Sequence, residues 1–394
     1  MDADWSQLLP ELLEMIAKKL TIYIDYVRFR AVCVKWRSIL SPTPHHLPCQ
    51  LPWLMLRPGP QSGSRRGFFS ISENKLRRLY LPEPHGSHCC GSSQGWLVIV
   101  EQGPTILLLN PLTCIQFQLP SLTTFPNVLD FNIRKVGKEF LLQDSSDGHR
   151  YTHNLDEMRY VFIKKVVLSS SPASPSSNYI AVAILNEIGE LAFCKKGDEK
   201  WMLIKDAGFY HEDVIYYKGL FYAVNYKGSL TICDVSGISP LVTVIEPLLP
   251  ISHHADRLYL VDSFGELLLV TRYLELIHDP DLEFVVVYKT YGFDVFRLDS
   301  SIQEWVEVKS LGDRMLFLGT NSSLCLLATD FSGCEANCIY FTNDYHEVND
   351  DAVHDHDSGV FNVGDGSMKA LPYCTGDYNL LFLPPPIWVS PNPC

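Results

Sequence analysis

Apolar residues near the amino end recur at the spacing of an α-helix. The first set lies three or four positions apart: Leu9, Leu13, Ile16 and Leu20. Ser6 is a candidate N-cap, and Pro10 suits a first helical turn because its missing N–H needs no partner there. A second apolar stripe ends before Pro42: Val32, Cys33, Trp36, Ile39 and Leu40. We predict two or three short amphipathic helices, which cannot bury all of this apolar surface among themselves and need a partner surface.

The pattern changes after a segment rich in proline. Residues 41–52 contain four prolines, so neither a helix nor a strand continues through them. Beyond this segment, short β-branched and aromatic runs alternate with Gly, Asn, Asp and Ser, which is the pattern of strands and turns. No long helical pattern appears.

A unit made of a strand, a polar turn and a second strand recurs along the rest of the chain. We identify five copies, at residues 105–119, 191–204, 230–237, 293–308 and 359–371. Repeated four-stranded units of about 40–50 residues are typical of β-propeller blades, and roughly 320 residues would hold six or seven of them. We expect Trp201 and Trp305 to pack inside blades rather than line a ligand face. A pair of stacked β-sandwiches is the alternative architecture.

Composition indicates a folded chain and argues against some partners. Hydrophobic residues make up 46% and charged residues 20% of the chain. The net charge of −13 disfavours binding to nucleic acid or to anionic lipid. There is neither an export signal nor an apolar run long enough to span a bilayer. We therefore interpret the twelve cysteines as reduced thiols and expect a location in the nucleus, the cytoplasm or both.

Candidate chemistry is weak throughout the chain. Cys334 and Cys338 lack a second pair at zinc-site spacing. Residues 344–357 are rich in Asp and His and could hold a divalent ion, but a solvated loop is the preferred interpretation. His88 precedes two cysteines, yet no acid that would orient it as a base is identifiable. Phosphate-binding loops and the Gly-x-Ser-x-Gly elbow are absent. We predict a protein that is not an enzyme and needs no cofactor.

The amino-terminal pattern resembles an F-box, the adaptor-binding module of SCF-type ubiquitin ligases. The resemblance lies in the opening Leu9-Pro10-x-Leu12-Leu13-x-x-Ile16 and the close Val32-Cys33-x-x-Trp36-Arg37. It implies an all-α module of three helices, whose first loop and last helix dock on a Skp-type adaptor. The positions that it assigns to adaptor binding are Leu9, Pro10, Leu12, Leu13, Ile16, Leu20, Val32, Cys33 and Trp36. The middle helix departs from the usual leucine-rich form. The alternative is a plain helical hairpin that caps the larger domain.

The rest of the chain resembles the plant F-box proteins that carry a KIB-type, kelch-like β-propeller. The segments that carry this resemblance are residues 260–270, 296–299, 305–319, 333–344 and 384–391. We therefore predict an F-box over residues 1–42, a proline-rich connector over 43–60 and an all-β, KIB-type propeller of about six or seven blades over 61–394.

Together the two resemblances imply a non-catalytic substrate-recognition subunit of an SCF-type E3 ubiquitin ligase. The F-box would bind a Skp-type adaptor and, through it, a cullin and RING scaffold. The propeller would hold a target protein that the sequence does not specify near a ubiquitin-charged partner. One alternative is a scaffold whose helices only cap the propeller or dimerise. Another is a propeller enzyme or glycan-binding module that uses the acidic segment 344–357.

Overall fold

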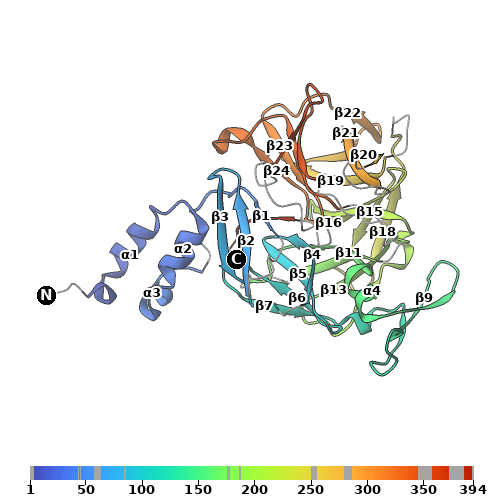
Figure 1. The fold of residues 1–394 in the computed structure, drawn as a ribbon, viewed down its shortest axis with the longest axis horizontal. Coiled ribbons are helices and arrows are strands. Elements are labelled where there is room, and N and C mark those ends of the chain that lie inside the picture. The colour runs from blue at the N-terminus through green and yellow to red at the C-terminus, as the bar shows by residue number, and fades with distance from the viewer. Residues whose placement is uncertain are drawn as a thin grey trace.

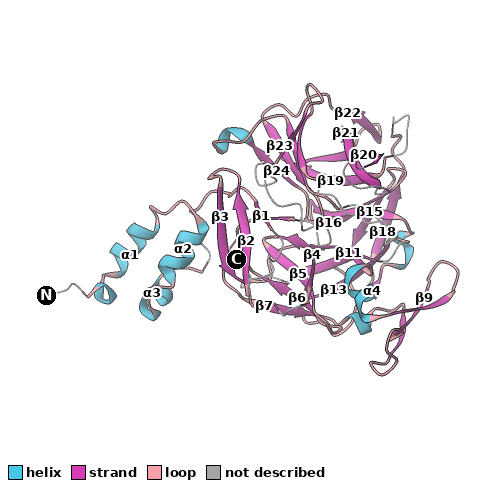
Figure 2. Ribbon diagram, viewed as in Figure 1, coloured by secondary structure: helices cyan, strands magenta, loops and turns pink. Residues whose placement is uncertain are grey.

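The computed structural model has two parts, a group of short helices and a ring of β-sheets (Figures 1 and 2). It describes residues 4–42, 44, 46–56, 64–83, 86–174, 178–185, 188–249, 255–278, 286–344, 357–371 and 386–392. The helices project from one side of the ring, beside β2 and β3. The two segments of residues 345–356 and 372–385 lie outside the described residues, and with them most of the acidic segment 344–357.

The helical part contains one 3₁₀ turn and three α-helices: η1 (Trp5–Gln7), α1 (Pro10–Ala17), α2 (Tyr23–Arg30) and α3 (Val34–Ile39). Pro10 lies in the first turn of α1, as predicted, but the helix begins at this residue and its N-cap is Leu9. Ser6 is therefore not the cap of α1. It lies inside the 3₁₀ turn η1. The N-cap of that turn is Asp4, whose carboxylate accepts a hydrogen bond from the backbone N–H of Ser6.

The helices share a small core of their own. Its buried members are Leu13, Ala17, Tyr26, Trp36, Leu40 and Leu47. The indole N–H of Trp36 donates to the carbonyl of Trp5 at 3.2 Å, and the hydroxyl of Tyr26 donates to the carbonyl of Ser41 at 2.8 Å. The first bond joins α3 to η1, and the second joins α2 to the segment that follows α3. The helices thus bury part of their apolar surface among themselves and leave the rest exposed, in agreement with the prediction that they cannot bury all of it.

Six sheets form the ring, and we number them as blades in chain order. Blade 1 is β28 (Ile387–Val389), β1 (Trp53–Met55), β2 (Arg65–Ser70) and β3 (Lys75–Tyr80). Blade 2 is β4 (His88–Ser93), β5 (Trp96–Val100), β6 (Ile106–Leu109) and β7 (Gln116–Leu119). Blade 3 is β11 (Ile163–Leu168), β12 (Ile180–Leu185), β13 (Glu190–Lys195) and β14 (Met202–Leu203).

The other three blades follow in the same way. Blade 4 is β15 (His211–Tyr217), β16 (Leu220–Asn225), β17 (Leu230–Asp234) and β18 (Leu241–Ile245). Blade 5 is β19 (Arg257–Ser263), β20 (Glu266–His278), β21 (Val286–Asp299) and β22 (Glu304–Glu307). Blade 6 has five strands in the order β24 (Leu324–Leu327), β23 (Arg314–Leu318), β25 (Cys338–Phe341), β26 (Gly359–Asn362) and β27 (Met368–Ala370).

A seventh, three-stranded sheet is inserted between blades 2 and 3 and projects from the ring (Figure 1). It consists of β8 (Val128–Phe131), β9 (Phe140–Gln143) and β10 (Arg150–His153), and α4 (Leu155–Tyr160) leads from it into blade 3. Three further 3₁₀ turns complete the described elements: η2 (Leu122–Thr124), η3 (Lys205–Ala207) and η4 (Ala328–Asp330).

Six apolar clusters lie between successive blades, which makes the ring a β-propeller and not a pair of sandwiches. The alternation of side chains along a strand explains how each blade serves two clusters. In β12, Ala181 and Ala183 pack toward blade 2, whereas Val182 and Ile184 pack toward blade 4. The described residues therefore form six blades, within the predicted range.

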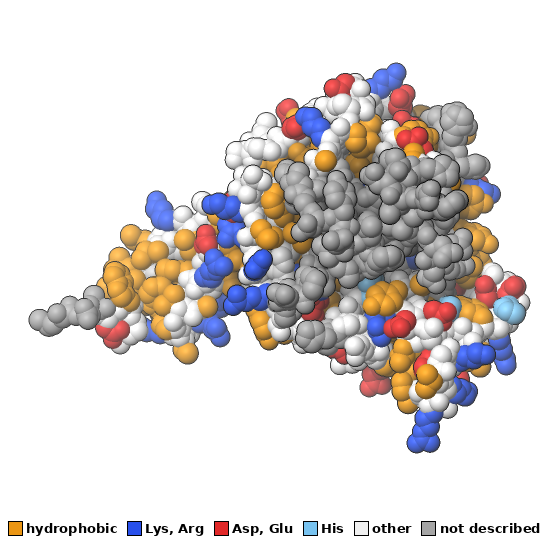
Figure 3. Space-filling view, viewed as in Figure 1, with side chains coloured by type: hydrophobic (Ala, Val, Ile, Leu, Met, Phe, Trp, Pro, Cys, Tyr) orange, Lys and Arg blue, Asp and Glu red, His pale blue; other side chains and the backbone are white. Residues whose placement is uncertain are grey.

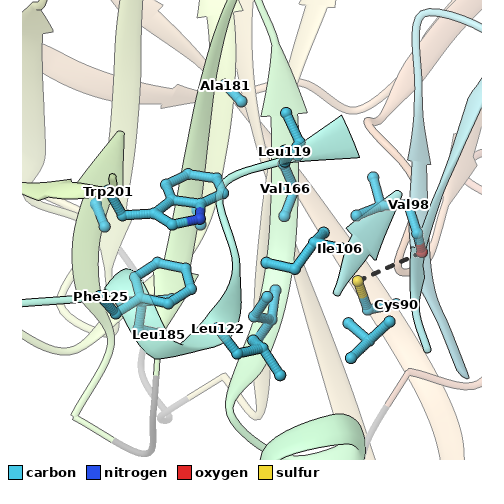
Figure 4. Packing of buried hydrophobic residues seen from close by; sticks show 14 of the residues in the cluster. Cys90, Val98, Ile106, Leu119, Leu122, Phe125, Val166, Ala181, Leu185 and Trp201 are labelled. Atoms are coloured by element: carbon cyan, nitrogen blue, oxygen red, sulfur yellow. Dashed lines mark hydrogen bonds between the residues drawn. The ribbon is translucent and has the colours of Figure 1, made fainter. Parts of the chain in front are cut away.

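Both tryptophans that the sequence assigns to blade packing are buried. Trp201 stacks on Phe125 with ring centroids 4.7 Å apart, and its indole N–H donates to the carbonyl of Pro120 at 2.9 Å. Figure 4 shows this pair against the aliphatic side chains of blades 2 and 3. The indole N–H of Trp305 donates to the carbonyl of Gly228, also at 2.9 Å, which links blade 5 to blade 4.

The ring is closed by the carboxyl-terminal strand. β28 pairs antiparallel with β1, so that Trp53 lies opposite Val389 and Leu54 opposite Trp388. β1 lies within the segment predicted as a connector, and the ring thus begins at Trp53 rather than at residue 61. Pairing with β28 makes this three-residue apolar segment a buried strand. The prolines that precede it give no indication of a strand.

Candidate functional site

One face of the helical part leaves large apolar side chains exposed. We call it the helical apolar face, and it consists of Trp5, Leu9, Leu12, Met15, Ile16, Val32 and Val34. Leu9 is 60% exposed and Val34 is 84% exposed. Figure 3 shows apolar side chains gathered on this part of the molecule. Monomeric proteins rarely leave large apolar side chains exposed together in this way unless they contact a partner or a membrane.

The predicted adaptor-binding residues divide into an outer and an inner set. Leu9, Pro10, Leu12, Ile16 and Val32 are exposed, and Leu20 and Cys33 are half-buried. Leu13 and Trp36 are 0% and 7% exposed in the helical core, so they pack the helices and are not available to a partner. The geometry of α1 explains the division, because Leu13 and Ala17 lie four residues apart on its inner side.

Trp5, Met15 and Val34 are also exposed, although the F-box resemblance does not assign them to adaptor binding. Met15 lies three positions after Leu12, which is the spacing of neighbours on one helix face. The spacing from Leu12 could therefore have identified Met15 as a member of the same exposed helix face. Val34 begins α3 just beyond the predicted Cys33, and only the orientation of that helix shows that its side chain faces outward.

Only a small part of the helical surface attaches to the ring. Ile24 of α2 is buried in the cluster between blades 1 and 2, beside Trp53 and Phe68, and Ile22 packs against the same cluster. Two hydrogen bonds also hold the connector to the helices, from Gln50 to the carbonyl of Thr21 at 3.0 Å and between His46 and the carbonyl of Ala17 at 3.0 Å. The helical apolar face takes no part in this attachment and stays open.

A second candidate site is a cavity of about 260 Å³ near the axis of the ring. Its walls include inner strands of blades 2 to 5, and its charged and polar lining includes His88, Lys165, Glu212, Asp213, Arg257 and Asp344. Lys165 forms a buried ion pair with Asp213. Asp213 also accepts from the backbone N–H groups of Leu260 at 2.7 Å and Val214 at 2.8 Å. Burial raises the pKa of Asp213, and the Lys165 ammonium opposes that effect.

Arginines pair the remaining carboxylates of this region. Arg257 donates to Glu212 at 3.1 Å and to the carbonyl of Asp344 at 3.1 Å. The fully buried Arg272 donates to Oδ1 of Asp344 at 2.9 Å and to Oδ2 of Asp357 at 2.7 Å. Burial alone would lower the pKa of Arg272, but Tyr259 and the two carboxylates raise it above the ordinary value. These charges are therefore held in pairs by the fold.

Burial makes the thiols of Cys89, Cys90 and Cys334 poor nucleophiles. Desolvation raises the pKa of the Cys89 thiol to about 12 and also raises that of Cys90, so both are protonated at neutral pH. Desolvation likewise raises the pKa of Cys334 to about 11, and Cys338 is buried on β25. Among the described residues no three His, Cys, Asp or Glu side chains lie together as metal ligands would. The described helices include none that is long and apolar enough to cross a membrane.

The closed ring of six blades defines the chain as a β-propeller protein with a helical amino-terminal part. Residues 68–362 match the family described as KIB1-4 beta-propeller. F-box protein SKIP23 of Arabidopsis thaliana is 30% identical over 410 residues, which cover 98% of this chain and 96% of that protein. F-box protein At2g17036 of the same plant is 27% identical over 406 residues, which cover 98% and 95%.

These similarities show that the chain belongs to the plant F-box proteins with a KIB-type β-propeller, as the sequence resemblance predicts. Among solved structures, the RRP9 WD40 repeats superimpose with a TM-score of 0.35 at 9% identity, covering 79% of this chain and 93% of that one. A TM-score this low adds nothing to the assignment.

Proposed function

We propose that this protein is the substrate-recognition subunit of an SCF-type E3 ubiquitin ligase. In this proposal the helices within residues 1–42 are the F-box, which binds a Skp-type adaptor and through it a cullin and RING scaffold. The propeller binds the target protein. The open helical apolar face, in a chain that belongs to an F-box family, carries the proposal.

The energetics of that face support a docking role. A fully buried Leu, Ile or Val side chain contributes about 1.5–3 kcal/mol relative to the exposed state. Leu9, Leu12, Ile16 and Val32 are 40–61% exposed, so a partner that covers them gains roughly half of this free energy at each position without disturbing the helical core. The role needs no chemistry from this chain, because holding a target near a ubiquitin-charged enzyme raises its effective concentration.

The same proposal includes the cellular setting. A chain with a net charge of −13 is repelled by phosphate backbones and anionic lipid, which favours protein partners over nucleic acid or membranes. We place the complex in the nucleus, the cytoplasm or both, where a reduced state suits the free thiols described on blades 2, 3, 4 and 6.

The test is co-purification of the full chain with a recombinant Skp-type adaptor. The variant L9A/P10A/I16A changes three exposed positions, one just before α1 and two within it, and should lose the adaptor while keeping the thermal unfolding of the propeller. The variant L129A/L276A, which truncates exposed leucines on β8 and β20, is the matched control and should retain it. Wild-type retention of the adaptor by L9A/P10A/I16A would show that the docking assignment is wrong.

The alternative is that the helices mediate dimerisation. Light scattering of the wild-type chain distinguishes the two functions. A stable dimer that L9A/P10A/I16A converts to monomer, together with no adaptor binding by the wild type, would assign the helical apolar face to self-association.

A further inference from the structure

The outer strand of blade 4, β18, is an unprotected sheet edge. It ends the order β15-β16-β17-β18, and among the described residues no backbone hydrogen bond pairs its outer side over Leu241–Ile245. Pro240 precedes it and Pro247 follows soon after, so about five residues of extended backbone are available. β18 lies on the side of the ring away from the helices (Figure 1).

The other blades protect their outer strands, and β18 does not. The outer strands of blades 1, 5 and 6 contain charged residues: Lys75, Arg77 and Arg78 on β3, Glu304 and Glu307 on β22, and Lys369 on β27. β14 has two residues only, and β7 carries two glutamines. β18 has the sequence Leu-Val-Thr-Val-Ile, without charge, proline or a large polar side chain. Natural sheets blunt free edges with charges, prolines or short strands. Among the described outer strands, β18 alone has neither these features nor a large polar side chain, which indicates a use.

An apolar groove runs beside this edge. Its volume is about 450 Å³, within the range of ligand-binding clefts, and it is lined mainly by Pro126, Phe193, Met202, Leu203, Pro240 and Val242. Lys205 and Asp206 at its rim carry opposite charges and leave it neutral. Leu241 is 69% exposed and Ile238, in the turn before the strand, is completely exposed.

The position of β18 within the blade aligns its edge with this groove. Val242 packs against the cluster between blades 3 and 4, whereas Ile245 packs against the cluster between blades 4 and 5. The two faces of the strand are thus fixed by its neighbours, and its backbone edge points away from the ring. A strand added to that edge would direct alternate side chains toward the groove, since side chains alternate across a sheet.

We propose that β18 and the adjoining groove bind an extended peptide segment of a partner protein by strand addition. The peptide would have aliphatic side chains at alternate positions and neutral or basic residues between them. Charge supports this choice, because residues 230–249 contain Asp234 and Glu246 but no Lys or Arg. The nearby ammonium of Lys195 is already held by the carbonyls of Ser236 and Gly237. A second copy of the chain, itself at −13, would be repelled.

The experiment measures binding of a fluorescein-labelled peptide, KVTVTVK, to the full chain by fluorescence anisotropy. We expect saturable binding by the wild type and a loss of about tenfold or more in affinity for L241K/V244K, which places lysines on the edge. The control L129K/L276K adds the same charge at exposed leucines of β8 and β20 and should bind as the wild type does. Absence of binding by the wild type, or equal losses in both variants, would overturn the proposal.

Two further measurements separate strand addition from other modes. Two N-methylated peptides test the backbone pairing, one methylated on the amides of one strand edge and the other on the amides of the opposite edge. N-methylation removes the N–H donors of that edge, so the peptide methylated on the edge that faces β18 must lose binding. If both still bind, the contact is not a strand. If the wild type is a dimer and L241K/V244K is a monomer, β18 binds a second copy of the chain, and the peptide-binding proposal is wrong. Adaptor binding should be unchanged in L241K/V244K, so this inference and the proposed ligase function can fail separately.

Discussion

The guanidinium of Arg272 donates to Oδ2 of Asp357 at 2.7 Å with both side chains buried. The same guanidinium donates to Oδ1 of Asp344 at 2.9 Å. Arg272 belongs to blade 5, whereas the two carboxylates lie just after β25 and just before β26 of blade 6. One buried cation therefore joins two blades and fixes the two ends of the acidic segment at the ring.

We predict that Arg272→Ala destabilises the protein by about 3–5 kcal/mol, because removing one partner leaves two buried carboxylates without compensation. Urea unfolding of the full chain measures the loss. The matched control is Arg297→Ala, which breaks a half-exposed pair with Glu266 and should cost about 0–1 kcal/mol. Equal losses in the two variants would show that the Arg272 network does not hold the blades together.

The Lys165 and Asp213 pair in the axial cavity should behave as one unit. Lys165→Met leaves a buried carboxylate, and Asp213→Asn leaves a buried ammonium, so each variant should lose about 3–5 kcal/mol. Asn keeps an oxygen that can accept from Leu260 and Val214. The double variant should therefore lose clearly less than the sum of the two single variants. Additive losses in urea unfolding would contradict a coupled pair.

The pH dependence of Lys165→Met follows from the raised pKa of Asp213. A carboxyl whose pKa is higher in the folded state binds its proton more readily there, so its favourable contribution is complete below the ordinary value of 3.8 and is lost as the pH rises through the folded pKa. Without Lys165 the folded pKa should rise further, because the ammonium no longer opposes burial.

We therefore expect the unfolding free energy of Lys165→Met to recover, relative to Lys165→Met/Asp213→Asn, as the pH falls from neutral toward that folded pKa. Parallel pH profiles of the two variants would show that Asp213 is not the titrating group. The double variant is the matched control, since it differs only in the group that titrates.

Closure of the ring by Trp388 gives a third stability prediction. Trp388 is fully buried on β28 and contacts Phe317 of blade 6 edge to face, with centroids 5.2 Å apart. Trp388→Ala should lose about 3–5 kcal/mol and weaken the pairing of β28 with β1. Hydrogen exchange at Trp53–Met55 would report that weakening. Trp5→Ala, at an exposed tryptophan, should change neither measurement.

Local patterns of the sequence predicted the blades well because the relevant contacts are local. Four of the five repeated units span the two outer strands of blades 2, 3, 5 and 6, where a short turn joins neighbouring strands, whereas the unit at residues 230–237 covers only β17 of blade 4. Trp201 and Trp305 were expected in blade cores, and both are buried there. The stretch between the first two repeated units holds the inserted sheet of β8, β9 and β10, which belongs to no blade.

Long-range partners could not be predicted in this way. Arg272 lies in a strand where a charged side chain is read as exposed, and its carboxylates come 72 and 85 residues later. β1 is a three-residue strand whose partner is at the far end of the chain. The exposure of β18 likewise follows from its place at the end of a sheet, because its own sequence is that of a buried strand.

Adjacent leucines on α1 separate docking from packing and give the sharpest test of the helical apolar face. The sequence assigned both Leu12 and Leu13 to adaptor binding, but Leu12 is exposed and Leu13 is buried in the helical core. Leu12 is 40% exposed, so Leu12→Ala should weaken adaptor binding by about three- to eightfold, which corresponds to about 0.6–1.2 kcal/mol of lost burial, and leave thermal unfolding unchanged. Leu13→Ala should destabilise the helical part by about 2–5 kcal/mol.

Isothermal titration with a Skp-type adaptor and thermal unfolding followed by circular dichroism distinguish the two effects. If Leu12→Ala binds as tightly as the wild type while remaining folded, the adaptor does not cover this face of α1. If Leu13→Ala leaves the unfolding profile unchanged, the helical core does not depend on Leu13. The opposite pattern, in which Leu13→Ala alone weakens binding at unchanged stability, would mean that α1 turns its inner side toward the adaptor and that the helices rearrange when it binds.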